Sequence, residues 1–372
     1  MKVKALPLIT VRLQIVALLM LGLLLSGCDD KPEEEKGFAG LADDASSYAR
    51  VTPGKRFEFP DDHGPHADFR IEWWYVTANL KDADGQSFGV QWTLFRNALP
   101  RAKGLQGDGA GWSNRNLWMG HAAVTSQDEH FAAERYARGG VQQAGVTLAP
   151  FAAWIDDWSF TSQSASDDPL ADMQLQASGP QFNYRLRLKA TKPLVLQGKQ
   201  GFSQKSEQGQ ASYYYSQPFF QANGSIEIDG KTYQVSGPAW LDREWSSQPL
   251  TDNQTGWDWF SLHLGDGAEV MLYRMRQKDG EPYLTGTWIN ADGSTEQLAA
   301  ADIALAPEDT TDVEGRDMPT RWSVKIPSKA VDIAVEALNP QAWMNLQIPY
   351  WEGPVTISGS HEGVGYLEMT GY

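Results

Sequence analysis

Two short segments of this chain combine carboxyl groups with tryptophans, a combination suited to acid–base chemistry on an apolar ligand. In the first, Trp240, Asp242 and Glu244 share one face of an extended strand, because side chains alternate along a strand. Two carboxyls beside a tryptophan in an apolar cavity can have separate pKa values and serve as proton donor and acceptor. The alternative is a polar connector between domains, satisfied by Arg243 and by backbone donors.

The second segment ends in a strand on which Glu72 and Trp74 face one side and Trp73 and Tyr75 face the other. If Glu72 faces the inside of a barrel, it must pair with a cation or be kept neutral by desolvation. An ion pair with Arg70, two residues earlier on the same face, is the alternative to a catalytic role. The segment therefore supplies another candidate carboxyl.

Just before that strand, His63, His66 and Asp68 have side chains that can ligate a metal. The intervening Gly64-Pro65 pair favours an ordinary turn with side-chain hydrogen bonds, so neither a metal nor a cofactor is predicted. The chain also lacks a Walker loop, a dinucleotide fingerprint and a His-Glu-x-x-His motif. Its Gly-x-Ser-x-Gly match, Gly85-Gln86-Ser87-Phe88-Gly89, begins at an Asp-Gly pair typical of a hairpin and not at the strand-to-helix turn of a nucleophile elbow, so the motifs do not support a hydrolase assignment.

These segments need a framework, and the composition of the 372 residues favours β-structure. Fifteen Trp, 35 Gly and 20 Pro are typical of short strands joined by tight turns rather than of long helices. Asp and Glu outnumber Lys and Arg by 47 to 31, which argues against nucleic acid as a partner.

Hairpin turns are predicted at a series of Asp-Gly and Asn-Gly pairs. The pairs are Asp84-Gly85, Asn223-Gly224, Asp229-Gly230, Asp266-Gly267, Asp279-Gly280 and Asp292-Gly293. The last three lie 13 residues apart along the chain, which indicates an up-and-down meander.

A weak internal repeat suggests that the meander occurs twice. Trp74-Tyr75, Leu94-Phe95-Arg96 and Gly120 have later counterparts in Trp259-Phe260, Leu272-Tyr273-Arg274 and Gly286. Chance similarity between aromatic-rich strands is the alternative. We predict an all-β fold of two tandem antiparallel β-barrels, covering residues 51–236 and 237–372. Closing each meander would remove exposed edges and leave an interior able to hold a small apolar molecule.

The N-terminus has the features of a bacterial lipoprotein precursor. A basic start and an apolar run end at Cys28, the single cysteine, in a cleavage box of small residues. We predict a signal peptide at residues 1–27, a lipid on Cys28 and an acidic tether at residues 28–50. The expected location is the periplasmic side of the cell envelope, with Asp29 favouring the inner over the outer membrane.

Several motifs together resemble the AttH-like secreted proteins related to the hydroxyneurosporene synthases, which are carotenoid hydratases. The motifs are Asp62-His63-Gly64-Pro65-His66, Glu72-Trp73-Trp74-Tyr75, Gln91-Trp92-Thr93-Leu94-Phe95-Arg96, Trp118-Met119-Gly120-His121-Ala122 and Ala239-Trp240-Leu241-Asp242-Arg243-Glu244-Trp245. The resemblance implies two lipocalin-like barrels. It also implies a gene neighbourhood that often contains an ABC-type export permease. It covers roughly residues 55–370.

In the hydratases, water is added to an isolated carbon–carbon double bond by protonation, without a cofactor. The resemblance implies Asp242 as proton donor, Trp240 facing the carbocation, and His121 or Glu72 activating water. Ligand contacts are predicted at Trp240, Trp74 and Glu244. Hydratases tend to have a histidine where this chain has Arg243, so an acidic Asp242 requires Arg243 to point away from it.

Three functions follow from the sequence. The first is binding of a lipid or other apolar small molecule, for which an ABC-type transporter is the candidate partner. The second is a cofactor-independent hydratase or isomerase for an isoprenoid-like ligand. The third is a carbohydrate or envelope-polymer binding module, because exposed aromatic patches also bind sugars. For the first two, we expect a cavity in the first barrel where Glu72, His121, Trp240 and Asp242 converge.

Overall fold

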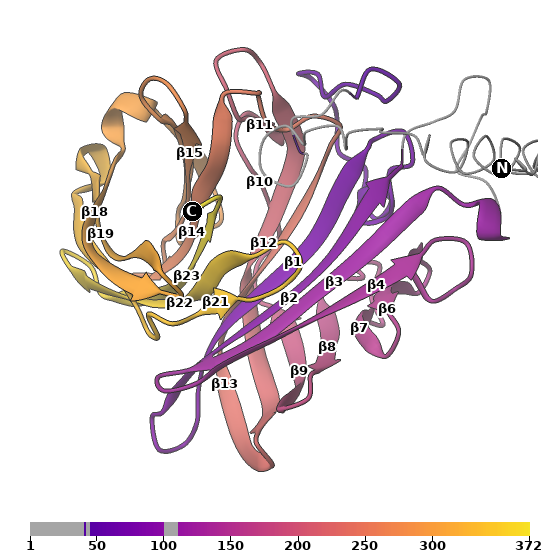
Figure 1. Cartoon of the computed structure of the whole chain (residues 1–372), viewed down its shortest axis with the longest axis horizontal. Coiled ribbons are helices and arrows are strands. Elements are labelled where there is room, and N and C mark those ends of the chain that lie inside the picture. The colour runs from indigo at the N-terminus through magenta and orange to yellow at the C-terminus, as the bar shows by residue number, and fades with distance from the viewer. Residues whose placement is uncertain (1–40, 42–44, 100–110) are drawn as a thin grey trace, which may run out of the picture. The chain divides into compact units, whose positions relative to one another are not determined.

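The described part of the chain folds almost entirely into antiparallel β-strands arranged in two sheets (Figure 1). The computed structural model describes residues 41, 45–99 and 111–372. Both sheets belong to one unit, Lys36–Tyr372. Four short 3-10 helices accompany them: η2 (Asp61–His63), η3 (Gly111–Ser113), η4 (Ala300–Asp302) and η5 (Pro327–Lys329). Within the described residues, no helix is long and apolar enough to cross a membrane.

The first sheet has 13 strands. They are β1 (Ile71–Lys81), β2 (Ser87–Ala98), β3 (Asn116–Ser126), β4 (His130–Arg138), β5 (Ala144–Leu148), β6 (Phe151–Ile155), β7 (Trp158–Ser162), β8 (Asp172–Ser178), β9 (Phe182–Ala190), β10 (Val195–Leu196), β11 (Phe202–Gln204), β12 (Ala211–Ile228) and β13 (Lys231–Ser246).

The second sheet has 10 strands. They are β14 (Gln254–Leu264), β15 (Glu269–Gln277), β16 (Tyr283–Ile289), β17 (Thr295–Leu298), β18 (Ala304–Val313), β19 (Arg316–Ile326), β20 (Val331–Ala337), β21 (Trp343–Met344), β22 (Tyr350–Gly359) and β23 (Gly363–Thr370).

Both sheets begin and end with the same connectivity. Each begins with a four-strand meander, β1–β4 or β14–β17, and the last strand, β13 or β23, pairs with the first. Along the main path of pairing the edges are β4 and β5 in the first sheet, and β17 and β18 in the second. The predicted all-β fold with two tandem lipocalin-like barrels is confirmed. Neither barrel is closed by hydrogen bonds between its described edge strands.

The strand register agrees with part of the internal repeat. Leu94 of β2 pairs with Gly120 of β3, and its counterpart Leu272 of β15 pairs with Gly286 of β16. The Trp74-Tyr75 part is out of register by one residue, because Trp74 pairs with Leu94 whereas Trp259 pairs with Tyr273.

A buried ion pair is repeated as well. Glu72 is the cross-strand partner of Arg96 and forms an ion pair with it, and Asp258 has the same relation to Arg274. Asp258 also pairs with Arg276. Because the second copy lies outside the candidate site described below, this carboxylate–arginine pair is part of the framework of each barrel.

Most of the predicted turns are confirmed. Asp229-Gly230, for example, connects β12 to β13 with φ angles of +47° and +80°, as a tight hairpin turn requires. Asn223-Gly224 was predicted wrongly, because it lies inside the 18-residue strand β12. Gly224 has a φ of +154°, and an added Cβ atom would meet the backbone of Arg185 on β9. This glycine permits a close approach of two strands rather than a turn.

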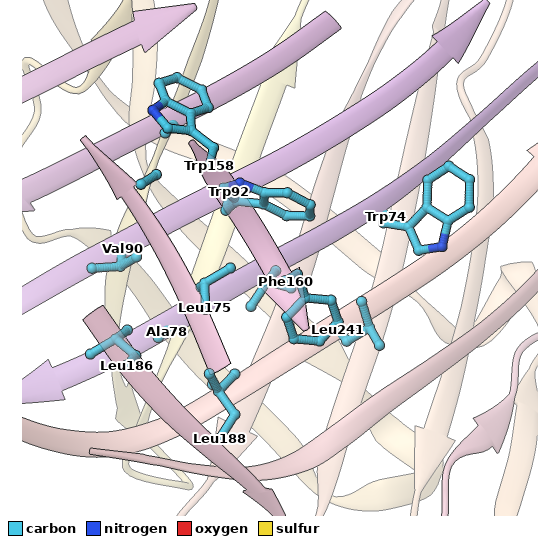
Figure 2. Packing of buried hydrophobic residues seen from close by; sticks show 14 of the residues in the cluster. Trp74, Ala78, Val90, Trp92, Trp158, Phe160, Leu175, Leu186, Leu188 and Leu241 are labelled. Carbon is cyan, nitrogen blue, oxygen red and sulfur yellow. The ribbon is translucent and has the colours of Figure 1, made fainter. Parts of the chain in front are cut away.

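Three large apolar clusters organise the interior of the described residues. One fills the first barrel, and Figure 2 shows Trp74, Trp92, Trp158 and Phe160 packed there among aliphatic side chains. A second cluster fills the second barrel. The third lies between the sheets and takes residues from both, including Trp240 from β13. The expected cavity inside the first barrel is therefore replaced by packed side chains.

Close contact between the sheets depends on a glycine. A Cβ atom added to Gly89 of β2 would lie 2.5 Å from Pro354 of β22 and from the hydroxyl of Tyr366 on β23. The backbone of β2 at Gly89 therefore packs directly against side chains of the second sheet.

The boundaries differ from those predicted. Residue 236 lies inside β13, which pairs with β1 and β12 over its length, so the sheets divide the chain between Ser246 and Gln254. Within the predicted tether, Ala45 and Tyr48 are buried, and the Tyr48 hydroxyl donates to the carbonyl of Leu99 at 2.7 Å. The end of that segment packs on the first sheet because it carries this tyrosine. Cys28 lies outside the described residues.

Candidate functional site

A cavity opens between the two sheets and brings together most of the predicted site residues. The space open to the centres of water-sized molecules measures about 120 Å³, and all of its empty space, with open solvent at the mouth included, about 1030 Å³. Four carboxyl residues line it: Glu72, Asp242, Glu244 and Glu368. Its aromatic lining includes Trp73, Tyr75, Phe95, Trp257, Trp259 and Tyr350. An apolar wall with a few polar groups is typical of small-molecule sites.

Asp242 is a buried carboxyl held by three donors. Tyr214 donates to Oδ2 at 2.5 Å, while Ser216 and the indole of Trp240 donate to Oδ1 at 2.5 and 2.6 Å. Burial raises the pKa of Asp242 to about 7, against the lowering effect of these hydrogen bonds and with a further rise from the charge of Glu244. Asp242 can therefore hold or release a proton near neutral pH.

Glu244, two residues further along the same face of β13, has a cation partner. Its Oε1 atom lies 3.1 Å from the ammonium of Lys205, and it also accepts a hydrogen bond from Ser212. The Tyr273 hydroxyl donates to Oε2 at 3.3 Å, and the same ammonium lies 3.7 Å from the centre of the Tyr273 ring. This carboxylate is fixed by its neighbours, although it lines the cavity as predicted.

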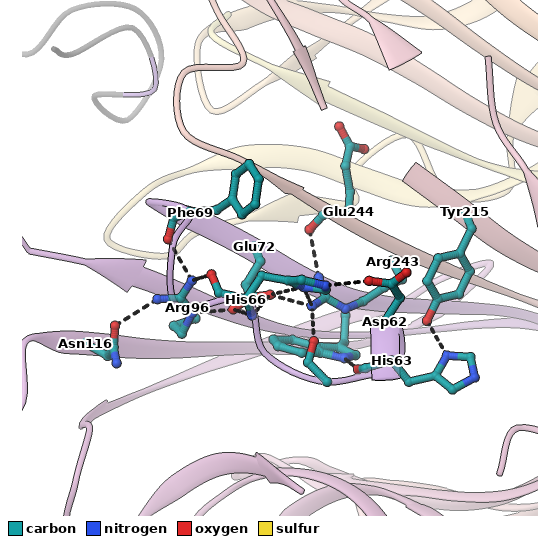
Figure 3. A network of polar contacts seen from close by, with 12 residues as sticks. Asp62, His63, His66, Phe69, Glu72, Arg96, Asn116, Tyr215, Arg243 and Glu244 are labelled. Atoms are coloured by element: carbon teal, nitrogen blue, oxygen red, sulfur yellow. Dashed lines mark hydrogen bonds and ion pairs between the residues drawn. The ribbon is translucent and has the colours of Figure 1, made fainter. Parts of the chain in front are cut away.

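Glu72 is the centre of a buried ionic network (Figure 3). Arg96 and Arg243 both form ion pairs with its carboxylate, and His66 donates to it through its backbone amide at 3.0 Å. Burial alone would raise the pKa of Glu72, but the two guanidinium groups hold it far below its ordinary value. Glu72 therefore orients the wall of the cavity and is a poor proton acceptor.

The partners of Glu72 correct the alternative that named Arg70. Cross-strand neighbours lie about 4.5–5.5 Å apart at Cβ, which is closer than residues i and i+2 along one strand. Arg96 is the direct partner of Glu72 on β2, and Arg243 reaches it from β13.

Arg243 points away from Asp242, as an acidic Asp242 requires. Its guanidinium lies 3.9 Å from the centre of the Trp74 ring, on the face of the first barrel interior. The backbone carbonyls of Gly64 and Glu244 accept from it at 2.6 and 3.0 Å. In Figure 3 the Glu244 carboxyl points away from this guanidinium.

His121 of β3 also lines the cavity. Its Nδ1 atom lies 2.9 Å from the Tyr350 hydroxyl, and its Nε2 atom has no hydrogen-bond partner among the described residues. Burial lowers the pKa of His121 to about 3. The imidazole is therefore neutral near pH 7. It can hydrogen-bond a water molecule but would not keep a proton taken from that water.

The two tryptophans predicted to contact ligand are not in the wall. Trp74 belongs to the core of the first barrel, and its indole donates to the carbonyl of His63 at 2.9 Å. Trp240 is fully buried behind Asp242 and reaches the cavity only through that hydrogen bond. Alternation correctly predicted which residues share a face but did not reveal which face borders the cavity.

The residues considered for metal binding are not brought together. His63 Nδ1 lies 2.6 Å from the Tyr215 hydroxyl, whereas His66 Nε2 lies 3.0 Å from Asp62 and Asp68 is exposed. The described residues contain no cluster of three His, Cys, Asp or Glu side chains that could hold a metal ion. The histidines of this segment instead connect η2 to the first sheet.

Sequence reasoning missed several residues of the wall. Glu368 of β23 and Lys205 are isolated in the sequence, and no motif marks them. Trp257 and Trp259 could have been found, because they share a face of β14 and Trp259 belongs to the repeat. The second sheet contributes one of the four carboxyls and several aromatic side chains to the cavity.

Comparison with known proteins agrees with this architecture. The acyclic carotenoid 1,2-hydratase of Rubrivivax gelatinosus is 32% identical over 76 residues, which are 20% of this chain and 18% of the hydratase. The chain thus matches less than a fifth of that relative's length.

Solved structures match over most of the chain. An AttH from Nitrosomonas europaea has 32% identity and a TM-score of 0.76, covering 87% of this chain and 99% of that one. Kievitone hydratase from Nectria haematococca has 15% identity and a TM-score of 0.66, covering 87% of this chain and 96% of that one, and shows the same fold. The AttH-like family model matches residues 50–372. The chain therefore belongs to the AttH-like family.

Proposed function

We propose that this protein binds an apolar, unsaturated small molecule between its two sheets and protonates it, as a cofactor-independent hydratase or isomerase. One observation carries the proposal. Asp242 faces an aromatic cavity, has no ion-pair partner among the described residues, and has a pKa raised to about 7 by burial. A carboxylic acid kept neutral near physiological pH in an apolar site is suited to general acid catalysis.

The reaction begins with proton transfer from Asp242 to one carbon of a double bond. The resulting carbocation lies among Tyr75, Trp257 and Trp259, whose ring faces stabilise positive charge. Addition of water with loss of a proton gives an alcohol, and loss of a proton from a neighbouring carbon gives the isomer. His121 is placed to orient the water.

The proposed substrate class follows from the lining and from the relatives. The cavity is mostly aromatic and aliphatic, and a relative over 76 residues is a hydratase of acyclic carotenoids. An isoprenoid chain with isolated double bonds suits the apolar lining of the cavity and agrees with the substrate of that relative. The envelope-polymer alternative has less support, because none of the 14 tryptophans whose burial is described is exposed.

The test offers lycopene, an acyclic carotenoid, to the intact purified protein and follows its hydration by chromatography and mass spectrometry. Asp242→Asn keeps the shape of the side chain and removes the acid, so turnover should fall on the order of 10²–10⁴-fold. Lycopene binding, measured by calorimetry, should persist. Asp128→Asn, at an exposed turn between β3 and β4, is the matched control.

Two results would contradict the enzyme. Binding of lycopene without turnover by the wild-type protein would leave an apolar-ligand carrier. Equal turnover by wild type and Asp242→Asn would remove Asp242 as the acid.

We also propose that the chain is lipidated at Cys28 and faces the periplasm, where it can act beside an ABC-type permease. The support is the leader sequence that ends at the single cysteine. Globomycin should cause the precursor to accumulate, and a soluble, unlipidated full-length protein would contradict the proposal. Retention in the inner membrane should depend on Asp29, so Asp29→Ser should redistribute the protein on membrane fractionation.

A further inference from the structure

Two glutamates lie opposite one another on adjacent strands of the second sheet. Glu352 of β22 and Glu368 of β23 are direct cross-strand partners. Directly opposed side chains have Cβ atoms about 4.5–5.5 Å apart, and two like charges at that separation are destabilising. The pair is therefore stable when at least one of the two carboxyls is protonated.

The two carboxyls have different surroundings. Glu352 is buried behind the wall, where it accepts a hydrogen bond from the Tyr75 hydroxyl, and its Oε2 atom has no partner among the described residues. Glu368 is only half-buried, lines the cavity, and accepts from the Trp257 indole at 2.5 Å. Burial followed by the charge of Glu368 raises the pKa of Glu352 far above its ordinary value. Glu352 is the member of the pair that retains its proton.

The four carboxyls in the cavity wall fall into two classes. Glu72 is paired with Arg96 and Arg243, and Glu244 is paired with Lys205, as described above. Among the described residues, no cation forms an ion pair with Asp242 or Glu368. The two unpaired carboxyls come from different sheets and line one cavity.

We propose that Glu368, supported by Glu352, is the second acid–base group of this cavity and accepts the proton of the attacking water. This assignment rests on the proposed function. It gives the two sheets separate roles, with the acid on β13 and the base on β23.

The proton balance closes without a co-reactant. The O–H bond of Asp242 breaks as a C–H bond forms on the substrate, which leaves a carbocation and an Asp242 carboxylate. A water oxygen then bonds to the cation, and one O–H bond of that water breaks as its proton moves to the Glu368 carboxylate. A proton leaves Glu368 for solvent and another returns to Asp242, so the product is the substrate plus one water.

Glu368 has a proton affinity suited to this exchange. Desolvation of its carboxyl in the apolar cavity raises the pKa of Glu368 to about 7, against the hydrogen bond from Trp257, and the charges of Asp242 and Glu244 raise it further. His121 is less suitable as the acceptor, since its pKa is about 3. The titratable and charged groups on the walls around Glu368 are Glu352, Glu72, Tyr75, Arg96, His121, Lys205, Asp242, Glu244, Tyr273 and Tyr350.

The experiment compares lycopene hydration by the intact wild-type protein and by Glu368→Gln. The base must be ionised and the acid protonated, so the wild-type rate should rise and then fall with pH around 7. Glu368→Gln should lower the rate on the order of 10²-fold or more and remove the rising limb. Glu362→Gln, an exposed residue in the turn between β22 and β23, is the matched control and should leave both features unchanged.

A second variant distinguishes chemistry from folding. Glu368→Ala should regain part of its rate when formate is added, because a small carboxylate can occupy the space and accept the proton. Asp242→Asn should not respond to formate. Calorimetric binding of lycopene confirms that each variant is folded.

Each outcome has one reading. A wild-type rate and pH profile in Glu368→Gln would overturn the assignment of Glu368 while leaving Asp242 as the acid. The assignment would also be overturned by a combination of results. In that case Glu368→Ala is slow, does not bind lycopene and is not rescued by formate, while Glu368→Gln keeps the rising limb of the pH profile. Absence of turnover by the wild-type protein would defeat the proposed function and this assignment together.

Discussion

Asp242 and Arg243 are neighbours in sequence with opposite roles. Alternation along β13 places Asp242 in the cavity between the sheets and Arg243 in the first barrel, where it neutralises Glu72. The backbone thereby separates a permanent positive charge from a carboxyl that must remain protonated. An adjacent arginine is thus compatible with an acid at position 242.

Protonation of Asp242 should be detectable without any substrate. A raised pKa means that the folded protein binds a proton which the unfolded chain releases above pH 4, so this contribution to stability is lost as pH rises towards 7. Relative to Asp242→Asn, the wild-type free energy of unfolding should fall by about 1.4 kcal/mol per pH unit between pH 5 and 7. Urea unfolding of both proteins measures it.

The difference between the two proteins is the informative quantity. His63, His121 and His130 have pKa values lowered by burial to about 3, 3 and 4, so they add stability as pH rises through the same range. They cancel in the comparison. A difference independent of pH would show that Asp242 is ionised throughout.

Arg243 should be among the most sensitive positions for stability. Arg243→Met leaves Glu72 with one cation fewer in a fully buried network, which typically costs about 3–5 kcal/mol. Arg187→Met, which removes an exposed pair with Asp172, should cost far less, because water screens an exposed ion pair. Denaturant unfolding compares the two, and equal losses would contradict the framework role.

At the scale of elements, the packing of β2 against β22 and β23 sets the distance between the sheets. Gly89 has no side chain to separate them, and larger residues at that position would meet Pro354 and Tyr366. The same strand carries Arg96, which holds Glu72 in the wall. Strand β2 therefore links the sheet contact to the shape of the site.

Gly89→Val should widen this contact. Overpacking typically costs about 1–3 kcal/mol, and here the strain acts on the surface that carries the cavity. We expect lower stability and weaker lycopene binding by calorimetry. Ser87→Val at the start of the same strand is the control, and wild-type binding by Gly89→Val would show that the cavity does not depend on this contact.

At the scale of the whole molecule, the two barrels share one apolar cluster and one site. Tyr75 and Trp240 from the first sheet pack with Trp259 and Tyr273 from the second. Separating the barrels would expose this surface. The repeated sheets are therefore one functional unit.

The two sheets should unfold together. Because the shared cluster stabilises both, we expect the near-ultraviolet and far-ultraviolet circular dichroism signals to follow one cooperative transition. Two transitions separated in denaturant concentration would contradict a shared core.

Local patterns in the sequence predicted a large part of this molecule. Alternation predicted the shared face of Asp242 and Glu244, and Asp-Gly pairs predicted most turns. Whether a face borders a barrel or a neighbouring sheet depends on contacts between distant strands, which is why Trp74 was misplaced. Glu368 comes to line the same cavity as Asp242 only after β13 and β23 have paired with the first strands of their sheets, so no local signal predicts it.

The tryptophans of the cavity make the site an optical reporter of its own state. Trp257 donates its indole hydrogen to Glu368, and Trp73 and Trp259 line the same space. Indole emission responds to nearby charge and to quenchers, so it should shift as Glu368 titrates and fall when a polyene enters. Occupancy and protonation can therefore be read from the unlabelled protein, and Trp257→Phe should remove the pH-dependent part of the signal while retaining the part that follows ligand entry.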